Sequence, residues 1–190
     1  MSNICFGEGD ALYERYHDEE WGRPVRDERG LYEKLCLEAF QSGLAWITIL
    51  RKRDGFRAAF ENFDPEAVAR FGKRDTNRLL NDTGIVRNRL KIEAAIANAK
   101  ATVALRDGPQ PLPELIWSHA PPRRRRAPRD WADVPALSPE STALAQELKR
   151  HGFRFVGPTT AYALMQACGL VNDHLAGCRV RADVERARSG

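Results

Sequence analysis

The chain has 190 residues, of which 43% are hydrophobic and 29% are charged. This length and composition fit one globular domain with a sizeable core, and they exclude a disordered or fibrous chain. The formal net charge of +4 is a modest basic excess, too small by itself to indicate a nucleic-acid partner.

Neither a membrane-spanning segment nor a signal peptide is expected. No stretch approaches the roughly 18 apolar residues of a membrane helix, and MSNICFGEGD lacks basic and apolar leader regions. We therefore expect a cytoplasmic protein without a membrane partner, whose cysteines stay free thiols. Cys36 and Cys168 lie in apolar helical stretches and are expected in the core, whereas Cys5 and Cys178 lie outside any strong apolar run.

Apolar residues recur at helical spacing almost throughout the chain. Asp10 is expected to cap the first helix, and Asp64 followed by Pro65 marks a later start. The piece AWITIL could be helix or strand by pattern alone. The expected helical segments, in chain order, are 10–21, 30–43, 44–63 (an apolar helix followed by a shorter one), 64–71, 75–84, 87–108, 111–119, 138–152 and 157–169. With no convincing alternating run, the predicted fold class is all-α.

Two basic clusters interrupt this pattern. The arginine-rich segment PPRRRRAPRDW covers residues 121–131, and a second cluster contains Arg87, Arg89 and Lys91. Each could contact nucleic acid or form a solvated surface, and charge alone does not decide between these readings. The last residues, 179–190, are polar and are expected to form a flexible tail.

A helical hairpin is predicted near residues 152–160. One helix ends at Gly152, a short apolar loop follows, and the next helix starts at Gly157. Free backbone N–H groups at such a start suit a phosphate oxygen. The hairpin resembles the helix-hairpin-helix motif of base-excision DNA glycosylases, although an ordinary glycine-capped hairpin has the same pattern.

Three longer motifs are more specific: YHDEEWG, CLEAFQSGLAWITIL and FVGPTTAYALMQACGLVNDH. Together they resemble the DNA-3-methyladenine glycosylase I family over nearly the whole chain. The resemblance implies a helix-hairpin-helix glycosylase-like bundle with a single domain over 1–178. It also implies a monomeric hydrolase of base-excision repair that flips and excises 3-methyladenine from alkylated double-stranded DNA.

The same resemblance implies one structural zinc that joins the N- and C-terminal segments. The residues that match the family's ligands are Cys5, His17, His174 and Cys178. Two thiolates and two imidazoles suit tetrahedral Zn²⁺ without an open position. The spacing alone leaves open four unrelated residues, and Phe6 stands where the family pattern has tryptophan.

A base-binding pocket is implied around Glu38. An alkylated adenine in DNA is cationic, so a carboxylate can balance its charge and aromatic faces can attract it. By the resemblance, Glu38 is the catalytic carboxylate, Tyr16 and Trp46 are aromatic walls, and Tyr13 and Trp21 add to them. The alternative is that the aromatics are plain core.

DNA contacts are implied at two places. Leu44, after the turn that contains Gln41 and Gly43, could fill the stack left by a flipped base, or it could be a core leucine. At the hairpin, the resemblance implies backbone contacts from Gly157, Thr159 and Thr160.

Two departures from the wider superfamily bear on mechanism. Thr159 stands where bifunctional relatives carry a Schiff-base lysine, which predicts no lyase activity. Asn172 stands where the superfamily has a catalytic aspartate, and Asp173 is expected to point elsewhere.

Two other classes remain open from sequence: a DNA-binding module without catalysis, and a zinc hydrolase, which needs an open metal position.

Overall fold

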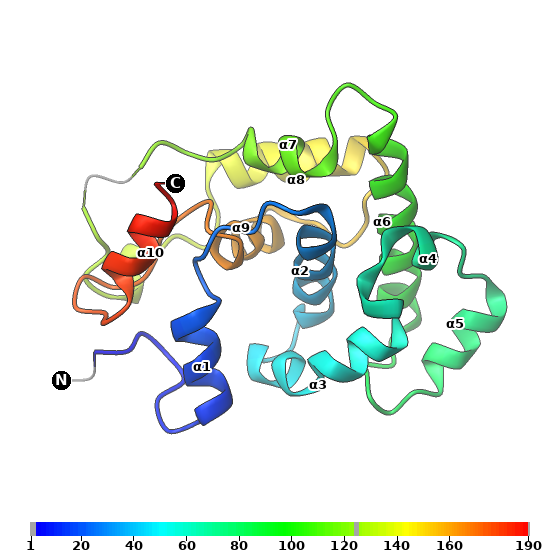
Figure 1. Cartoon of the computed structure of the whole chain (residues 1–190), viewed down its shortest axis with the longest axis horizontal. Coiled ribbons are helices and arrows are strands. Elements are labelled where there is room, and N and C mark those ends of the chain that lie inside the picture. Colours follow the sequence, from blue (N-terminus) through cyan, green and yellow to red (C-terminus); the bar gives the residue numbers. More distant parts are fainter. Residues whose placement is uncertain (1–2, 124–125, 190) are drawn as a thin grey trace.

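The computed structural model describes residues 3–123 and 126–189. Over these ranges the chain forms helices joined by loops and contains no strand, which confirms the all-α prediction (Figure 1). The α-helices are α1 (Ala11–Glu19), α2 (Glu28–Gln41), α3 (Trp46–Ala59), α4 (Pro65–Ala69), α5 (Lys73–Leu80), α6 (Arg89–Arg106), α7 (Leu112–Trp117), α8 (Pro139–Arg150), α9 (Pro158–Ala167) and α10 (Arg181–Ala187). Two short 3-10 helices are η1 (Glu61–Phe63) and η2 (Trp131–Asp133).

Local signals in the sequence set several helix starts. The side chain of Asp10 accepts hydrogen bonds from the first-turn N–H groups of α1, and Asp64 does the same for α4. Ser138 caps α8 with its hydroxyl. Such caps satisfy N–H groups that have no partner within the helix. The ambiguous piece AWITIL is helical and lies at the start of α3.

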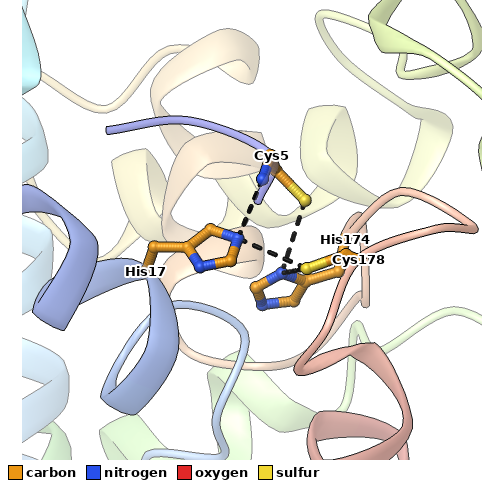
Figure 2. A group of neighbouring side chains, drawn as sticks. All are labelled: Cys5, His17, His174 and Cys178. Carbon is orange, nitrogen blue, oxygen red and sulfur yellow. Dashed lines mark hydrogen bonds between the residues drawn. The ribbon is translucent and has the colours of Figure 1, made fainter. Parts of the chain in front are cut away.

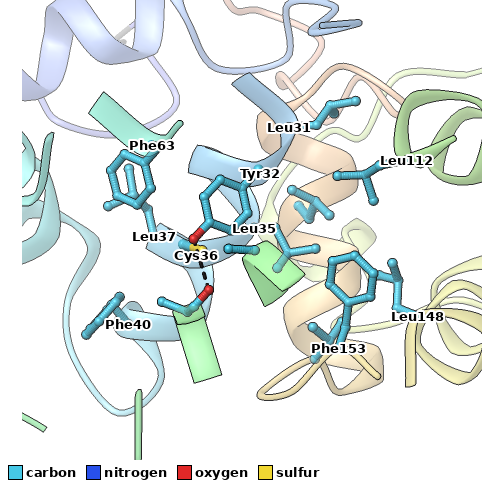
Figure 3. Packing of buried hydrophobic residues seen from close by; sticks show 14 of the residues in the cluster. Leu31, Tyr32, Leu35, Cys36, Leu37, Phe40, Phe63, Leu112, Leu148 and Phe153 are labelled. Carbon is cyan, nitrogen blue, oxygen red and sulfur yellow. Dashed lines mark hydrogen bonds between the residues drawn. The ribbon is translucent and has the colours of Figure 1, made fainter. Parts of the chain in front are cut away.

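Helix α2 lies at the centre of the core. It packs against α3, α6, α7 and α9, and its residues from Leu31 to Phe40 include an almost unbroken buried run (Figure 3). The Tyr32 hydroxyl donates to the carbonyl of Ala95 at 2.9 Å, so the one polar atom of that buried ring is satisfied. Burial on all sides gives α2 a fixed position, which matters because α2 carries Glu38.

The end of α9 is joined closely to the segment after α1. Val25 N–H donates to Cys168 O at 3.1 Å. Gly169 has φ +77°, and a Cβ there would lie 2.7 Å from the carbonyl oxygen of Gly22. Only glycine allows this approach without displacing the backbone.

Both ends of the described chain lie at the same end of the molecule (Figure 1). We expected residues 179–190 to be a flexible polar tail, whereas the structure places α10 there. Val184 is fully buried, and Arg188 donates to the carbonyls of Gly169 and Leu170, each at 2.7 Å. The polar pattern concealed this helix because arginine side chains, rather than an apolar stripe, attach it to the domain.

Within residues 3–123 and 126–189, no helix has the length and apolar character needed to cross a bilayer.

Candidate functional site

Four potential metal ligands from both ends of the chain come together in what we call the metal cluster: Cys5, His17, His174 and Cys178 (Figure 2). Their ligand atoms all lie within 4.8 Å of one another. Cys5 comes from the segment before α1 and His17 from α1 itself, while His174 and Cys178 come from the loop between α9 and α10. The sequence prediction of this grouping is therefore consistent with the fold.

The spacing in the metal cluster fits one tetrahedral ion. Cys178 Sγ lies 3.3 Å from His174 Nδ1 and 3.4 Å from His17 Nε2, and Cys5 Sγ lies 3.6 Å from His174 Nδ1. Zinc bonds of about 2.3 Å to sulfur and about 2.0 Å to nitrogen place tetrahedral ligands roughly 3.5 Å apart. The donor set therefore fits a metal with four protein ligands and no open position.

The outer nitrogen of each imidazole is occupied, which orients the ring. His17 Nδ1 lies 2.8 Å from the Asp18 carboxylate, and His174 Nε2 lies 3.0 Å from the carbonyl of Trp21. A carboxylate and a carbonyl only accept, so both outer nitrogens donate and both inner nitrogens carry a lone pair. Metal-bound histidines have this arrangement.

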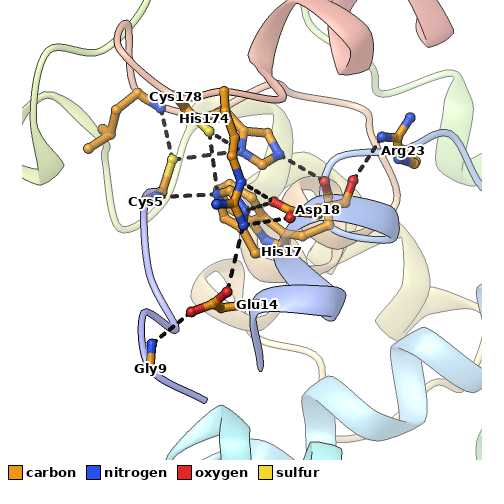
Figure 4. A network of polar contacts seen from close by, with 11 residues as sticks. Cys5, Gly9, Glu14, His17, Asp18, Arg23, His174 and Cys178 are labelled. Carbon is orange, nitrogen blue, oxygen red and sulfur yellow. Dashed lines mark hydrogen bonds and ion pairs between the residues drawn. The ribbon is translucent and has the colours of Figure 1, made fainter. Parts of the chain in front are cut away.

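Polar contacts continue outward from the metal cluster (Figure 4). Asp18 pairs with Arg179 at 2.6 Å, and Leu175 N–H donates to Cys5 Sγ at 3.2 Å. Burial lowers the pKa of His174 to about 4, and burial also lowers the pKa of His17. Both imidazoles are thus neutral near pH 7, the form that binds a metal.

A cavity of about 270 Å³ lies beside the metal cluster; we call it the aromatic pocket. Its lining residues are Phe6, Tyr13, Tyr16, Trp21, Glu38, Gln41, Trp46, Trp131, Ala163 and Gln166. The structure thus brings together Glu38, Gln41 and all the aromatic side chains proposed from sequence.

The aromatic pocket and the metal cluster share a wall. The Phe6 and His17 rings make an edge-to-face contact with centroids 4.9 Å apart. The Trp21 and His174 rings make the same kind of contact with centroids 4.6 Å apart.

Glu38 is the acidic group of the aromatic pocket. Its residue is only 6% exposed, and no hydrogen bond from residues 3–123 or 126–189 reaches its carboxyl group. Burial raises its pKa to about 7, against a smaller lowering by Lys34 one turn earlier on α2. Near neutral pH this carboxyl group is therefore poised between its two forms, and a cation in the pocket favours the ionised one.

Trp46 supplies an unused donor in the same pocket. Its indole Nε1 is buried and has no hydrogen-bond partner in the described part of the chain. Its ring lies 5.3 Å from that of Tyr16. Buried polar groups are almost always paired, so an unpaired donor near an unpaired carboxyl group indicates a place for a polar, planar ligand.

The turn after α2 lies at the edge of the aromatic pocket. Gly43 has φ +80°, and Leu44 is 38% exposed, which excludes the alternative of a core leucine. Gln41 donates through its side-chain amide to Leu44 O at 3.0 Å.

Lys91 holds this turn from the start of α6. Its Nζ donates to Phe40 O at 2.8 Å and to Ser42 O at 2.6 Å. Arg87 and Arg89 are exposed, which both a solvated surface and a nucleic-acid contact predict, whereas Lys91 is only 8% exposed and is not a surface side chain. A lysine ammonium can satisfy the free carbonyls at the end of a helix, a pairing that could not be predicted from the charge of Lys91 alone.

The predicted hairpin connects α8 and α9. Gly157 precedes α9, and Thr159 and Thr160 belong to its first turn. The Asn98 side chain of α6 accepts from Arg154 N–H at 2.7 Å and donates to Arg154 O at 3.2 Å. These two hydrogen bonds fix the loop between α8 and α9. The hairpin residues do not line the aromatic pocket.

Asn172 and Asp173 also lie outside the lining of the aromatic pocket. The Asn172 amide donates to Glu185 at 2.8 Å, toward α10. Asp173 accepts from the Tyr162 hydroxyl at 2.7 Å and from Gln166 at 2.9 Å. Asp173 therefore helps to orient a pocket residue without itself reaching the cavity.

The arginine-rich segment has a mixed role. Arg123 donates to the carbonyl of Arg188, which attaches the segment to α10, and the Arg129 side chain is 87% exposed. Residues 124–125 lie outside the described ranges. The charge pattern of this segment does not indicate that Trp131 lines the aromatic pocket. Phe6, Ala163 and Gln166 are further lining residues that were not predicted.

The chain is thus a helical domain in which four potential metal ligands lie beside an aromatic pocket that contains one buried carboxyl group. The chain belongs to the methyladenine glycosylase family, whose sequence profile matches residues 6–182. It is 45% identical over 172 residues to DNA-3-methyladenine glycosylase 1 of Escherichia coli (strain K12), a match that covers 89% of this chain and 91% of that protein.

Solved structures give the same relationship. A crystal structure of 3-methyladenine DNA glycosylase I superimposes with a TM-score of 0.90 at 44% identity, covering 94% of this chain and 98% of the other. The 3-methyladenine DNA glycosylase I of Staphylococcus aureus, solved to explain its recognition of 3-methyladenine, has a TM-score of 0.89 at 33% identity, with coverage of 95% and 97%.

Proposed function

We propose that this protein is a monofunctional DNA glycosylase that excises 3-methyladenine from alkylated double-stranded DNA and leaves an abasic site. The observation that carries the proposal is Glu38, a buried carboxyl group without a hydrogen-bond partner in the described chain, set among aromatic rings. Membership of the methyladenine glycosylase family supports the same substrate.

The pocket chemistry suits a cationic base that has been flipped out of the duplex. Methylation at N3 makes the adenine of the nucleotide cationic and weakens its glycosidic bond. Aromatic faces of Tyr16 and Trp46 attract the cation, and the ionised Glu38 accepts from the base edge and balances its charge. Tyr13 and Trp21 complete the aromatic surround.

Bond cleavage then needs little further help from the protein. The bond between the sugar C1′ and the base nitrogen breaks, and its electron pair returns to the ring, so the base leaves neutral. Water forms the new bond to C1′ and releases one proton. With Asn172 bonded toward α10 and Asp173 bonded to Tyr162, Glu38 is the carboxylate left to act in the pocket.

DNA is held by two surfaces. Leu44, exposed on its glycine turn, fills the stack that the flipped base leaves, with Gln41 and Gly43 shaping the turn. Gly157, Thr159 and Thr160 begin α9 in a helix-hairpin-helix arrangement, where backbone N–H groups suit a phosphate. Thr159 has no amine that could form a Schiff base, which supports the absence of lyase activity.

We further propose that the metal cluster holds one structural Zn²⁺. The four ligands leave no position for a reactive water, which disfavours a zinc hydrolase. Joining segments about 160 residues apart constrains the unfolded chain and stabilises the domain. We expect the enzyme to act as a monomer in the cytoplasm.

The experiment is to incubate the purified protein with methylated duplex DNA and to identify released bases by mass spectrometry. We expect free 3-methyladenine and strands that break only after heat or alkali treatment. Asn172→Ala should release the base at a near-normal rate. Salt-dependent DNA binding without release of any methylated purine would contradict the proposal and indicate a DNA-binding module.

A further inference from the structure

Trp131 lies at the mouth of the aromatic pocket. It begins η2, in the irregular segment between α7 and α8, and it lines the same cavity as Glu38. Trp131 is 44% exposed, whereas Tyr16 and Trp21 are 2% and 8% exposed. It is therefore the pocket aromatic whose surface is most open to solvent and available to an incoming ligand.

The indole of Trp131 is held in one orientation. Its Nε1–H donates to Cys5 O at 3.2 Å, across 126 positions of sequence. Its ring centroid lies 6.2 Å from that of Trp21 and 6.3 Å from that of Phe6, both in tilted contact, so the indole packs against two side chains of the pocket wall without stacking on either.

The turn that carries Trp131 is also held by hydrogen bonds. Asp130 caps η2 by accepting from Ala132 N–H at 2.9 Å, and Asp133 accepts from Arg129 N–H at 2.8 Å. A ring fixed before the ligand arrives loses little conformational freedom when the ligand binds.

We propose that Trp131 is the outer wall of the aromatic pocket and stacks on the excised base, which makes the turn formed by residues 129–133 part of base recognition. This inference rests on the proposed function. A planar base seated between the inner aromatics and Trp131 removes the open indole surface from water and gains a stacking contact. While the base is still cationic in the nucleotide, an indole is the aromatic group that attracts it most.

The test is the affinity for free 3-methyladenine, measured by isothermal titration calorimetry. Loss of one base-stacking ring weakens binding by about tenfold. We expect that weakening for Trp131→Ala and for Trp131→Leu, which keeps an apolar side chain but removes the ring. Trp131→Phe keeps a ring and loses the bond to Cys5, so its affinity should fall by about twofold to threefold.

The matched control is Leu137→Ala, an exposed apolar residue of the same segment that does not line the pocket. It should bind 3-methyladenine as the wild type does. Thermal unfolding and metal content of each variant separate loss of the wall from loss of the fold, and Trp131→Phe provides a conservative second variant.

The outcomes distinguish this inference from the proposed function. Wild-type affinity in a folded Trp131→Ala or Trp131→Leu protein would overturn the role of Trp131 and leave the glycosylase intact. A wild-type protein that neither binds 3-methyladenine nor releases it from methylated DNA would instead overturn the proposed function.

Discussion

The metal cluster and the aromatic pocket share a wall, yet they differ in whether their polar atoms have hydrogen-bond partners. In the metal cluster, both outer imidazole nitrogens have acceptors, and the four inner ligand atoms converge within 4.8 Å. In the aromatic pocket, the Trp46 indole nitrogen and the Glu38 carboxyl group have no hydrogen-bond partner in the described chain. A site whose polar groups are satisfied holds the fold together, whereas a site that leaves them free is ready for a ligand.

The metal side of the comparison should show the largest effect on stability. His174→Ala removes one ligand and should abolish stoichiometric metal binding. The free energy of unfolding should fall by at least about 3 kcal/mol, with Tm lower by roughly 6–12 °C. Thermal unfolding with elemental analysis checks both values. His151→Ala, an exposed histidine on the loop after α8, is the control; equal losses in the two variants would show that the cluster does not stabilise the fold.

In the aromatic pocket, the burial of Glu38 should make the free energy of unfolding depend on pH. Burial raises the pKa of Glu38 to about 7 from its ordinary 4.5, so the folded state holds a proton that the unfolded chain releases. The contribution is favourable below pH 4.5 and is lost as pH rises to about 7.

The Glu38→Gln variant has no ionisable group at this position. Its unfolding free energy relative to wild type should therefore increase by about 3 kcal/mol between pH 4.5 and 7 and change little above that range. Urea unfolding at a series of pH values measures this difference, and Glu19→Gln corrects for the loss of one surface carboxylate. Parallel pH profiles for wild type and Glu38→Gln would show that the carboxyl group is not strained by burial.

The turn beside the pocket should depend on Lys91. Lys91→Met removes the ammonium that bonds Phe40 O and Ser42 O, which leaves two carbonyls without that donor. The free energy of unfolding should fall by about 2 kcal/mol, and amide hydrogens of residues 42–44 should exchange faster. Lys100→Met, on the exposed side of α6, should change neither quantity. Unchanged exchange at the turn would refute its dependence on Lys91.

A substitution in the wall shared by the metal cluster and the aromatic pocket should have the smallest effect, and it should change both stability and ligand affinity. Trp21→Phe keeps the backbone carbonyl that accepts from His174. It replaces the indole that contacts His174 and lines the pocket with a smaller phenyl ring. Stability should fall by about 1 kcal/mol, and affinity for 3-methyladenine by a few-fold. Trp117→Phe, whose indole bonds Val25 O away from both regions, should lower stability alone. An effect of Trp21→Phe on only one region would show that the wall is not shared.

The sequence predicted the parts of the fold that depend on local chemistry. The predicted caps at Asp10 and Asp64 mark helix starts because a side-chain acceptor satisfies nearby N–H groups, and the predicted segment 138–152 begins at the cap of α8. The four potential metal ligands were predicted through the family resemblance, because the spacing of Cys5 and His17 is not that of a zinc finger.

Contacts between distant segments could not be predicted in this way. In the sequence, Lys91 cannot be told from a surface lysine, because its partner Ser42 O lies at the end of a distant helix. The segment around Trp131 has no periodicity that would indicate a contact with Cys5. The helix α10 was concealed because arginine hydrogen bonds to backbone carbonyls leave no hydrophobic pattern in the sequence.

The most direct test asks which of the two regions acts on the base. The measurement is the rate of 3-methyladenine release from methylated duplex DNA under single-turnover conditions. It compares fully metallated Glu38→Gln with chelator-treated wild type, kept folded at low temperature as judged by circular dichroism. We predict a loss of about 100-fold for Glu38→Gln, the scale of one lost electrostatic contact to the transition state, and a largely retained rate for the chelated protein. Near-normal release by Glu38→Gln, with release abolished by chelation of folded protein, would contradict the assignment of the chemistry to the aromatic pocket.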